Sequence, residues 1–402
     1  MSSVNILVTA DVCPHAKLEA SFLGAGGVKL IAPAQPFIDR ADLVIGNLEV
    51  ALCDEETPIP KCGPNLRVSP KAAAKLKELG FGLLTLANNH TMDEGIPGLE
   101  RTLAELRSQK IPHCGAGLTH EDACQPAVVS VKGKSVAVFN FAEGEYAQAQ
   151  GNGPGAARLD PFWSENRVQR ARGKYDIIIV VIHAGNEYQP IPSLVTAAFC
   201  RRMADAGADA VIAHHAHIPQ GMEYRHGVPV CFSLGNFLFG NEFGGHTVAW
   251  PGAWYLVSVA ELDFGDAGTT LRLHPFKQMP DLSLAELSPK GRAAFDRYLV
   301  RCNEILADPV LHQRYWEQEA RDLFKNLKPA LADAAKKLNS ENEEEAYRAA
   351  TLLYGLVHCD AHHETLERGL RLIYERRFAD APEIVQGLAE LRALIKECFV
   401  EG

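Results

Sequence analysis

Three histidines stand within four positions at the end of an apolar run, where imidazoles can bind a transition metal. The run is Ala-Asp-Ala-Val-Ile-Ala over residues 208–213, and His214, His215 and His217 follow it. In an extended segment, residues two apart point to the same side. We therefore expect His215 and His217 to face one metal site if the strand continues, or to diverge if the chain turns, and His214 to lie outside the site. The alternative is a polar loop that happens to be rich in histidine.

Other groups that can bind metal or move protons also follow apolar runs. In α/β folds, ligands bind at the carboxyl ends of the strands, where the following loops converge. Besides the histidine cluster, the polar residues at such ends are Asp11, Asn47, Glu49, Asn89, His90, His183 and Asn236. Imidazole suits Zn, Fe, Ni or Cu, whereas carboxylate, amide and water suit Mn, Mg or Ca. The mixed set predicts a divalent metal site and leaves the metal open.

Loop residues beside these strand ends are candidates for catalysis or substrate binding. Asp93 either caps the helix that starts after it or orients the imidazole of His90. Arg67 either clamps an anionic substrate or is structural. The histidines at 358, 362 and 363 are expected on a solvated helix face. The candidate substrate-binding residues are Arg67, Glu187, Asn236 and His246.

The elements that must position these residues alternate between strands and helices. Strands are predicted at 4–10, 41–46, 81–87, 175–182 and 228–234, helices at 70–79, 92–109 and 193–206, and hairpins at 125–141 and 254–275. This alternation predicts a layered α/β domain, and continuous apolar strands predict sheets buried on both faces. Residues 144–174 have no clear assignment.

The character of the chain changes after residue 289. Ala, Leu, Glu, Arg and Lys then recur at helical spacing, which predicts four to six helices. We therefore expect two parts, an α/β domain over residues 1–280 and an all-helical extension over 281–402. The extension is expected to act as a lid, to pack on the sheet or to mediate oligomers.

Composition limits the partners and the compartment. Hydrophobic residues make up 47% of the chain and the net charge is −10, which disfavours nonspecific binding to nucleic acid or anionic lipid. No window reaches the roughly 18 apolar residues of a membrane span. The ten cysteines form no Cys-x-x-Cys pair and no signal peptide is visible. We expect a cytoplasmic protein with no nucleic-acid or membrane partner.

Five motifs follow one another along the chain. These are Ala-Asp-Leu-Val-Ile-Gly-Asn-Leu-Glu at 41–49, Leu-Ala-Asn-Asn-His-Thr-Met-Asp-Glu-Gly at 86–95, His-Ala-Gly-Asn-Glu-Tyr at 183–188, the histidine cluster at 207–217 and Ser-Leu-Gly-Asn-Phe-Leu-Phe at 233–239. In these motifs and their order, the chain resembles the CapA-type, or poly-γ-glutamate capsule synthesis, branch of the calcineurin-like metallophosphoesterases. The resemblance covers about residues 3–275.

The resemblance implies a four-layer α/β/β/α sandwich with a metal centre at the strand ends. The positions that match the family's ligands are Asp11, Glu49, Asn89, His183, His215 and His217. Two positions depart from the phosphoesterase pattern. Cys13 stands where the first motif has histidine, and Asn47 stands where a bridging aspartate follows glycine. An uncharged amide bridges two cations poorly, so one or two ions of Ca, Mn, Mg or Zn are expected.

The favoured function is metal-assisted acid–base chemistry on a peptide or other carboxylate-bearing substrate. Relatives of this branch include peptide epimerases of lasso-peptide biosynthesis, so the resemblance implies proton removal and return at a Cα. The candidate pairs are His90 with Asp93, and Asp11 with His15 or His246. The alternatives are a metal-dependent phosphoester hydrolase and a non-catalytic factor for capsule biosynthesis.

Overall fold

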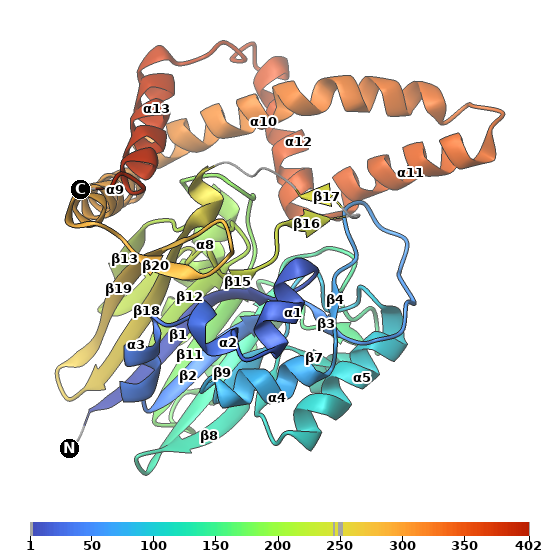
Figure 1. The fold of residues 1–402 in the computed structure, drawn as a ribbon. Coiled ribbons are helices and arrows are strands. Elements are labelled where there is room, and N and C mark those ends of the chain that lie inside the picture. Colours follow the sequence, from blue (N-terminus) through green and yellow to red (C-terminus); the bar gives the residue numbers. More distant parts are fainter. Residues whose placement is uncertain (1–2, 244–245, 248–251, 402) are drawn as a thin grey trace.

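The computed structural model describes residues 3–243, 246–247 and 252–401, and its centre is a pair of stacked β-sheets (Figure 1). The first sheet has the strand order β20-β19-β18-β1-β2-β5-β6, with β15 paired to β1. The second has the order β13-β14-β12-β11-β9-β8. Contacts of β1 with β12 and of β14 with β19 join the two sheets.

The strands of the first sheet are β1 (Val4–Cys13), β2 (Leu43–Leu48), β5 (Leu83–Thr85), β6 (His113–Cys114), β15 (Asn236–Phe239), β18 (Leu256–Gly265), β19 (Gly268–Gln278) and β20 (Leu284–Glu286). Those of the second are β8 (Ala127–Val131), β9 (Lys134–Ala142), β11 (Ile177–His183), β12 (Ala210–His214), β13 (Met222–Arg225) and β14 (Val228–Cys231). Short pairs are formed by β3 (Ala51–Leu52) with β4 (Arg67–Val68), β7 (Ala116–Gly117) with β10 (Gly155–Ala156), and β16 (Glu242–Phe243) with β17 (His246–Thr247).

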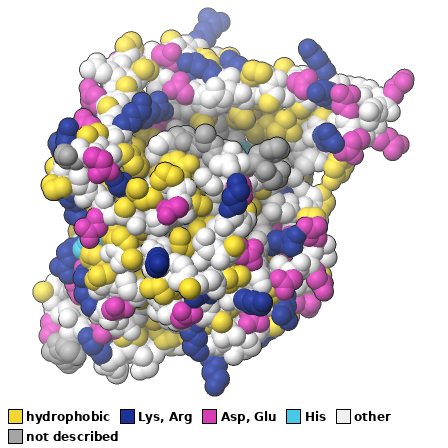
Figure 2. All heavy atoms as spheres, viewed as in Figure 1, with side chains coloured by type: hydrophobic (Ala, Val, Ile, Leu, Met, Phe, Trp, Pro, Cys, Tyr) yellow, Lys and Arg dark blue, Asp and Glu magenta, His cyan; other side chains and the backbone are white. Residues whose placement is uncertain are grey.

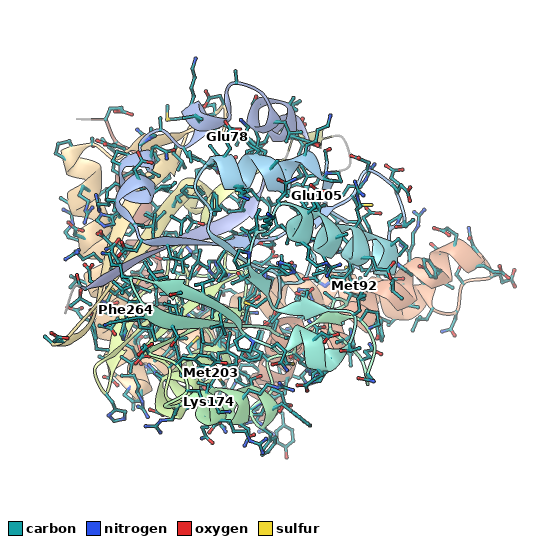
Figure 3. The ribbon with its side chains drawn as sticks, turned by 90° about the horizontal axis from the view of Figure 1, so that it is seen from below. Glu78, Met92, Glu105, Lys174, Met203 and Phe264 are labelled. Carbon is teal, nitrogen blue, oxygen red and sulfur yellow. The ribbon has the colours of Figure 1, made fainter. Side chains whose placement is uncertain are left out.

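Helices cover both outer faces of the sheet pair. They are α1 (Lys17–Leu23), α2 (Gly27–Leu30), α3 (Gln35–Arg40), α4 (Lys71–Glu78), α5 (Gly95–Ser108), α6 (His120–Ala123), α7 (Trp163–Ala171) and α8 (Leu194–Ala206), with a 3₁₀ turn at Gly252–Tyr255. Figure 3 shows Glu78 of α4 and Glu105 of α5 on one side of the strands, and Met203 of α8 on the other. The predicted α/β class with a helical C-terminal region is confirmed.

Strand direction explains why the polar residues converge. Strand β1 runs parallel to β2 and β15, and β11 runs parallel to β9 and β12. The register places Asp11 beside both Asn47 and Asn236. In the second sheet, His183 pairs with His214. The carboxyl ends of the two sheets therefore deliver their polar side chains to one edge.

Several elements of the structure were not predicted, because their length or composition gives little signal in the sequence. Helices α1 to α3 fill the interval between the first two strands, and α7 and β10 lie in the unassigned residues 144–174. The helix predicted at 92–109 begins only at Gly95, because residues 88–94 turn to present polar groups to the strand ends. The predicted strand at 81–87 is likewise limited to β5.

Five helices of the described chain follow residue 288: α9 (Pro289–Ala307), α10 (Pro309–Lys337), α11 (Glu343–His358), α12 (Asp360–Tyr374) and α13 (Pro382–Glu397). We call α10 to α12 the helical cover. Figure 1 shows that it lies over the edge where the polar strand ends meet. Among the described helices, none is long and apolar enough to cross a membrane. The domain boundary at residue 280 stays a prediction.

Candidate functional site

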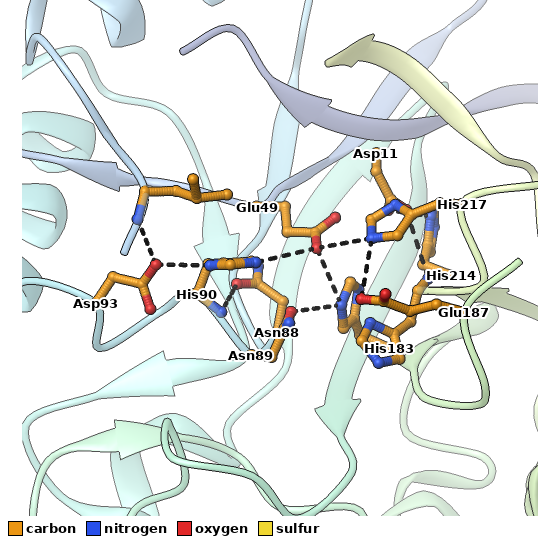
Figure 4. Close-up of polar contacts among 12 residues, drawn as sticks. Asp11, Glu49, Asn88, Asn89, His90, Asp93, His183, Glu187, His214 and His217 are labelled. Carbon is orange, nitrogen blue, oxygen red and sulfur yellow. Dashed lines mark hydrogen bonds and ion pairs between the residues drawn. The ribbon is translucent and has the colours of Figure 1, made fainter. Parts of the chain in front are cut away.

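The strand ends bring the expected metal-binding side chains into one buried cluster (Figure 4). Three groups have donor atoms within 4.8 Å of one another. They are Asp11 with Glu49 and His183, Glu49 with His215 and His217, and Glu143 with Glu145 and His215. Because Glu49 belongs to two groups and His215 to two, the groups form one continuous cluster.

Glu49 lies at the centre of this cluster. Its Oε1 atom is 3.4 Å from Nε2 of His183, 3.7 Å from Nε2 of His217 and 3.9 Å from Nε2 of His90. Neither carboxylate oxygen has a hydrogen-bond partner among the described residues, although the side chain is fully buried. Burial raises the pKa of Glu49 well above its usual value, and the charge of Asp11 raises it further.

Asp11 approaches the cluster from the first strand and is also fully buried. Its Oδ1 accepts a hydrogen bond from Nδ2 of Asn47 at 2.8 Å and lies 2.9 Å from Nδ1 of His214. Its Oδ2 lies 3.5 Å from Nδ1 of His217. Burial alone would raise the pKa of Asp11, but His214 and His217 outweigh it and hold the pKa well below its usual range. Asn47 therefore acts as a hydrogen-bond donor to Asp11.

Amide groups orient the two imidazoles nearest to Glu49. Oδ1 of Asn89 lies 3.0 Å from Nε2 of His183, and Nδ2 of Asn47 lies 3.1 Å from its Nδ1. Oδ1 of Asn236 lies 2.9 Å from Nδ1 of His217. Hydrogen bonds to the second ring nitrogen fix the tautomer and orientation of metal-binding histidines. The bond that Nδ1 of His217 donates to Asn236 thus leaves Nε2 directed at Glu49.

His215 and His217 reach the cluster through a strained backbone. Strand β12 ends at His214, and the next turn places His215 at φ 89° and His217 at φ 56°. Residues other than glycine in this region cost about 1–3 kcal/mol each and concentrate at functional sites. Strand alternation was therefore the wrong reason for their common direction. His214 belongs to none of the three groups, but it contacts Asp11.

The loop after β9 adds two carboxylates that sequence reasoning missed. Nε2 of His215 lies 3.2 Å from Oε1 of Glu143 and 3.6 Å from Oε1 of Glu145. Burial would lower the pKa of His215, but Glu143 and Glu145 raise it to about 10. Burial raises the pKa of Glu145 to about 7. Both glutamates directly follow a predicted strand, so the strand-end rule could have found them.

His90 and Asp93 form a close pair at the rim of the cluster. Nδ1 of His90 is 2.6 Å from Oδ2 of Asp93, which also accepts from the backbone N–H of Leu66 at 2.6 Å. Oδ1 of Asp93 pairs with the buried ammonium of Lys61, whose Nζ is 3.3 Å from Nδ1 of His90. Asp93 thus orients the imidazole and does not cap α5. Lys61 comes from the loop before β4 and had no sequence signal.

A cavity of about 520 Å³ opens beside the cluster. The cluster contributes Asn89, His90, Glu145, His215 and His217 to its wall. Apolar side chains from the sheet domain also line it, namely Leu66, Phe239, Phe243 and Trp254. The helical cover supplies Leu323, Asn326, Leu327, Ala361, His362 and Thr365. His362 is exposed, as expected for a solvated helix face, but it lies at the cavity.

The donor set of the cluster fits a divalent cation. The two oxygens of Glu49 are buried, lack hydrogen-bond partners among the described residues and face several imidazole nitrogens. A buried carboxylate left in this way is costly unless a cation or donor satisfies it. Carboxylate, imidazole and amide oxygen together suit Mn, Zn, Mg or Ca. The chemistry of the side chains therefore supports a metal site and leaves the ion open.

The remaining candidates are divided between the cavity and other places. Glu187 lines the cavity, and its Oε1 is 3.8 Å from Nε2 of His217. Asn236 is fully buried, lies 2.9 Å from His217 and is not among the described residues that line the cavity. Arg67 lies in a neighbouring pocket and pairs with Glu56, which favours its structural role. The side chain of His246 lies outside the described residues.

The second acid–base pair expected from the sequence, Asp11 with His15 or His246, stays a prediction for His246, whose side chain lies outside the described residues. Asp11 contacts His214 and His217, and the imidazole of His15 lies 3.1 Å from the carbonyl oxygen of Gly240. The described residues that line the cavity do not include Asp11. These contacts favour a role for Asp11 in holding a cation over a role in proton transfer.

Comparison with known proteins gives one family match. The family described as "Bacterial capsule synthesis protein PGA_cap" matches residues 5–241. The "PGA biosynthesis protein CapA" of Bacillus subtilis is 31% identical over 225 residues, which are 53% of this chain and 57% of that protein. The "Capsule biosynthesis protein CapA" of Bacillus anthracis is 32% identical over 214 residues, 51% of this chain and 52% of that one. The chain therefore spans little more than half of these relatives.

A solved structure of a hypothetical protein from Thermus thermophilus aligns with a TM-score of 0.44 and 19% identity. The alignment covers 68% of this chain and 99% of that one. A likeness at this level carries no argument about the site.

Proposed function

This chain belongs to the bacterial capsule synthesis protein family PGA_cap, and from that premise we propose that it is a metal-dependent enzyme that epimerises a peptide residue at Cα. The observation that carries the proposal is the juxtaposition of two features behind one cavity wall, which His90 and His217 line. One is the buried carboxylate of Glu49 without hydrogen-bond partners among the described residues, and the other is the close pair of His90 and Asp93. The first supports a cation, and the second supports proton transfer beside it.

The residues that would hold the cation are those around Glu49. Asp11 and His183 form one group with Glu49, and His215 and His217 form the other. A divalent cation bound here would withdraw electron density from a substrate carboxylate or carbonyl and so lower the pKa of the adjacent Cα proton. Zinc, manganese, magnesium and calcium all remain candidates, since the donors are mixed.

Proton transfer is assigned to residues on the cavity wall. Asp93 holds Nδ1 of His90, which leaves Nε2 to accept the Cα proton. The electron pair of the broken C–H bond then moves into the carbonyl or carboxylate group of the substrate. Glu145 lines the same cavity from the loop after β9, and we assign to it the return of a proton to Cα. Because this proton would be delivered to the face of Cα opposite to His90, no atom is gained or lost and one stereocentre is inverted.

Two observations weigh against phosphoester hydrolysis, which is the usual chemistry of this fold. Asn47 replaces the charged bridging ligand and donates its amide proton to Asp11. Cys13 replaces the first-motif histidine and is buried. The names of the curated relatives favour a second candidate, an accessory role in capsule biosynthesis in which the site only binds metal and carboxylates.

Hydrogen exchange separates these functions. Purified protein loaded with Mn²⁺ is incubated in D₂O with a panel of synthetic peptides, and deuterium at Cα is read by mass spectrometry. Epimerisation predicts incorporation that is lost in His90→Gln, while Glu100→Gln on the exposed face of α5 behaves like wild type. Absence of exchange across the panel, together with turnover of p-nitrophenyl phosphate, would assign hydrolysis instead. Absence of both activities would leave the accessory role.

A further inference from the structure

The helical cover forms part of the cavity wall. Leu323 and Leu327 of α10 line it, one helical turn apart on the same face. From α12, Ala361 and Thr365 line it in the same way. These residues lie beyond the matched family region, which ends at residue 241. The helical part of the cavity wall therefore lies outside the region that the family model matches. Figure 2 shows hydrophobic side chains on the underside of these helices, above the hollow in the surface.

Helix α12 is fixed to the sheet domain at the cavity itself. Nδ2 of Asn186 donates to the carbonyl oxygen of Ala361 at 3.1 Å and to Oγ1 of Thr365 at 2.9 Å. The backbone N–H of Gly144 donates to Oδ2 of Asp360 at 2.6 Å, and the N–H of Asp360 donates to the carbonyl oxygen of Gly144 at 2.8 Å. Gly144 separates the two glutamates that face His215. The wall and the cluster are thus held together by the same contacts.

Away from the cluster, much of the wall is apolar. The sheet domain contributes the aromatic rings of Tyr188, Phe239, Phe243 and Trp254 together with Pro64 and Leu66, and the cover contributes Leu323 and Leu327. Apolar side chains gain about 25 cal/mol for each Å² removed from water. A ligand could bury an apolar group against these side chains, because that group has no polar atom that needs a hydrogen-bond partner.

The charges on the wall disfavour an acidic side chain. The carboxylate of Glu187 lines the cavity, and the ammonium of Lys61 is already paired with Asp93. A second carboxylate placed in this cavity would meet like charge and would be partly desolvated, both of which oppose its binding. This arrangement differs from what a polymer of glutamate requires.

We propose that the helical cover selects a peptide whose residue at the cluster has an uncharged, apolar side chain. The inference rests on the proposed function for the peptide class, and adds the side chain that the cavity accepts. Leu323 and Leu327 would contact that side chain, while the metal cluster takes the adjacent carboxylate. The cover is then a specificity-determining element, and glutamate is rejected.

Calorimetric titration of the Mn²⁺-loaded protein tests this selection without turnover. The probes are Ala-Ala-Ala-Leu, Ala-Ala-Ala-Glu and a γ-linked glutamate trimer. Burial of one leucine side chain is worth at least about a tenfold difference in Kd, so the first probe should bind at least about tenfold more tightly than the others. Equal or tighter binding of either glutamate probe would overturn the inference.

Variants on one helix locate the selection. Leu327→Glu should abolish the preference for leucine, and the milder Leu323→Ala should reduce it several-fold if the first variant folds poorly. Val310→Glu is the matched control, because Val310 lies on the same helix, is 69% exposed and is not among the residues that line the cavity. Unchanged selectivity in both leucine variants would refute the role of the cover.

The binding measurement and the exchange measurement test different proposals, so one can fail while the other succeeds. A preference for the leucine probe without deuterium exchange in any peptide would uphold the selection and refute epimerisation. Exchange with no preference between the probes would uphold epimerisation and refute the selection.

Discussion

Replacing Glu49 by Gln should weaken metal binding and, in the metal-free protein, increase stability. The carboxylate is fully buried and lies within 3.4–3.9 Å of three imidazole nitrogens. With a cation present, its charge is a ligand. Without one, its charge is buried and unsatisfied. The same substitution therefore has opposite effects in the two states.

The loss of affinity follows from the lost charge. Two unit charges about 4 Å apart interact by about 4 kcal/mol at an effective dielectric constant of about 20. A ligand oxygen in contact with a divalent ion gains more, so at least about 1,000-fold weaker binding of Mn²⁺ is expected. An amide oxygen in the variant would recover part of the lost contact, but not the charge.

The gain in metal-free stability follows from the raised pKa of Glu49. Burial, with Asp11 adding to it, raises this pKa well above the usual value. Between the unfolded and folded pKa values the folded protein binds more protons, so its free energy of unfolding falls as pH rises through that interval. Gln does not titrate, so the variant avoids this loss. An unsatisfied buried polar group costs about 1–3 kcal/mol, which is the gain expected at pH 7.

Two measurements check the expected loss of metal affinity and the expected gain in metal-free stability. Mn²⁺ affinity is measured by calorimetry, and the Tm of chelator-treated protein is followed between pH 4 and pH 8. Glu100→Gln, on an exposed position of α5, is the control for loss of one negative charge. Wild-type Mn²⁺ affinity in Glu49→Gln would refute the ligand role. A lower Tm of the metal-free variant at pH 7 would show that the carboxylate is satisfied without a cation.

Other perturbations of the site have equally defined outcomes. Asp93→Asn should lower the exchange rate by about 10²–10⁴-fold, because His90 loses its 2.6 Å carboxylate partner, while metal stoichiometry by mass spectrometry stays at the wild-type value. Asn236→Ala should weaken Mn²⁺ binding by about 10–100-fold in calorimetry, because the ring of His217 loses its orienting bond; unchanged affinity would contradict this. The pKa of His215 is raised to about 10, so a cation must displace its proton at neutral pH, and Mn²⁺ affinity should rise between pH 6 and pH 9. A flat profile would exclude His215 as a ligand.

Much of the fold and cluster could be predicted because strand ends are local features. Apolar runs such as Ile177–His183 are readable in the sequence, and parallel strands place their last residues at one edge. This rule predicts that Asp11 and Glu49, at the ends of neighbouring strands of the first sheet, lie close together, whereas their approach to His183 depends on how the second sheet stacks on the first. The hydrogen bonds that orient them were not predictable, since the partners are 36 or more residues apart, as for Asn47 with Asp11.

The features that could not be predicted from the sequence depend on turns and on long-range packing. The common direction of His215 and His217 depends on two left-handed residues, and strand alternation does not describe that geometry. Lys61 meets Asp93 only because a loop between two short strands folds back on the site. The contribution of Leu327 to the cavity depends on how α10 docks, which its helical periodicity cannot specify.

Anomalous diffraction from crystals grown with Mn²⁺ shows whether a divalent cation binds at Glu49. We expect an anomalous peak about 2.0–2.6 Å from a carboxylate oxygen of Glu49, with His183 or His217 completing the shell. A well-ordered site with a water molecule against Glu49, and manganese only at the molecular surface, would contradict this expectation.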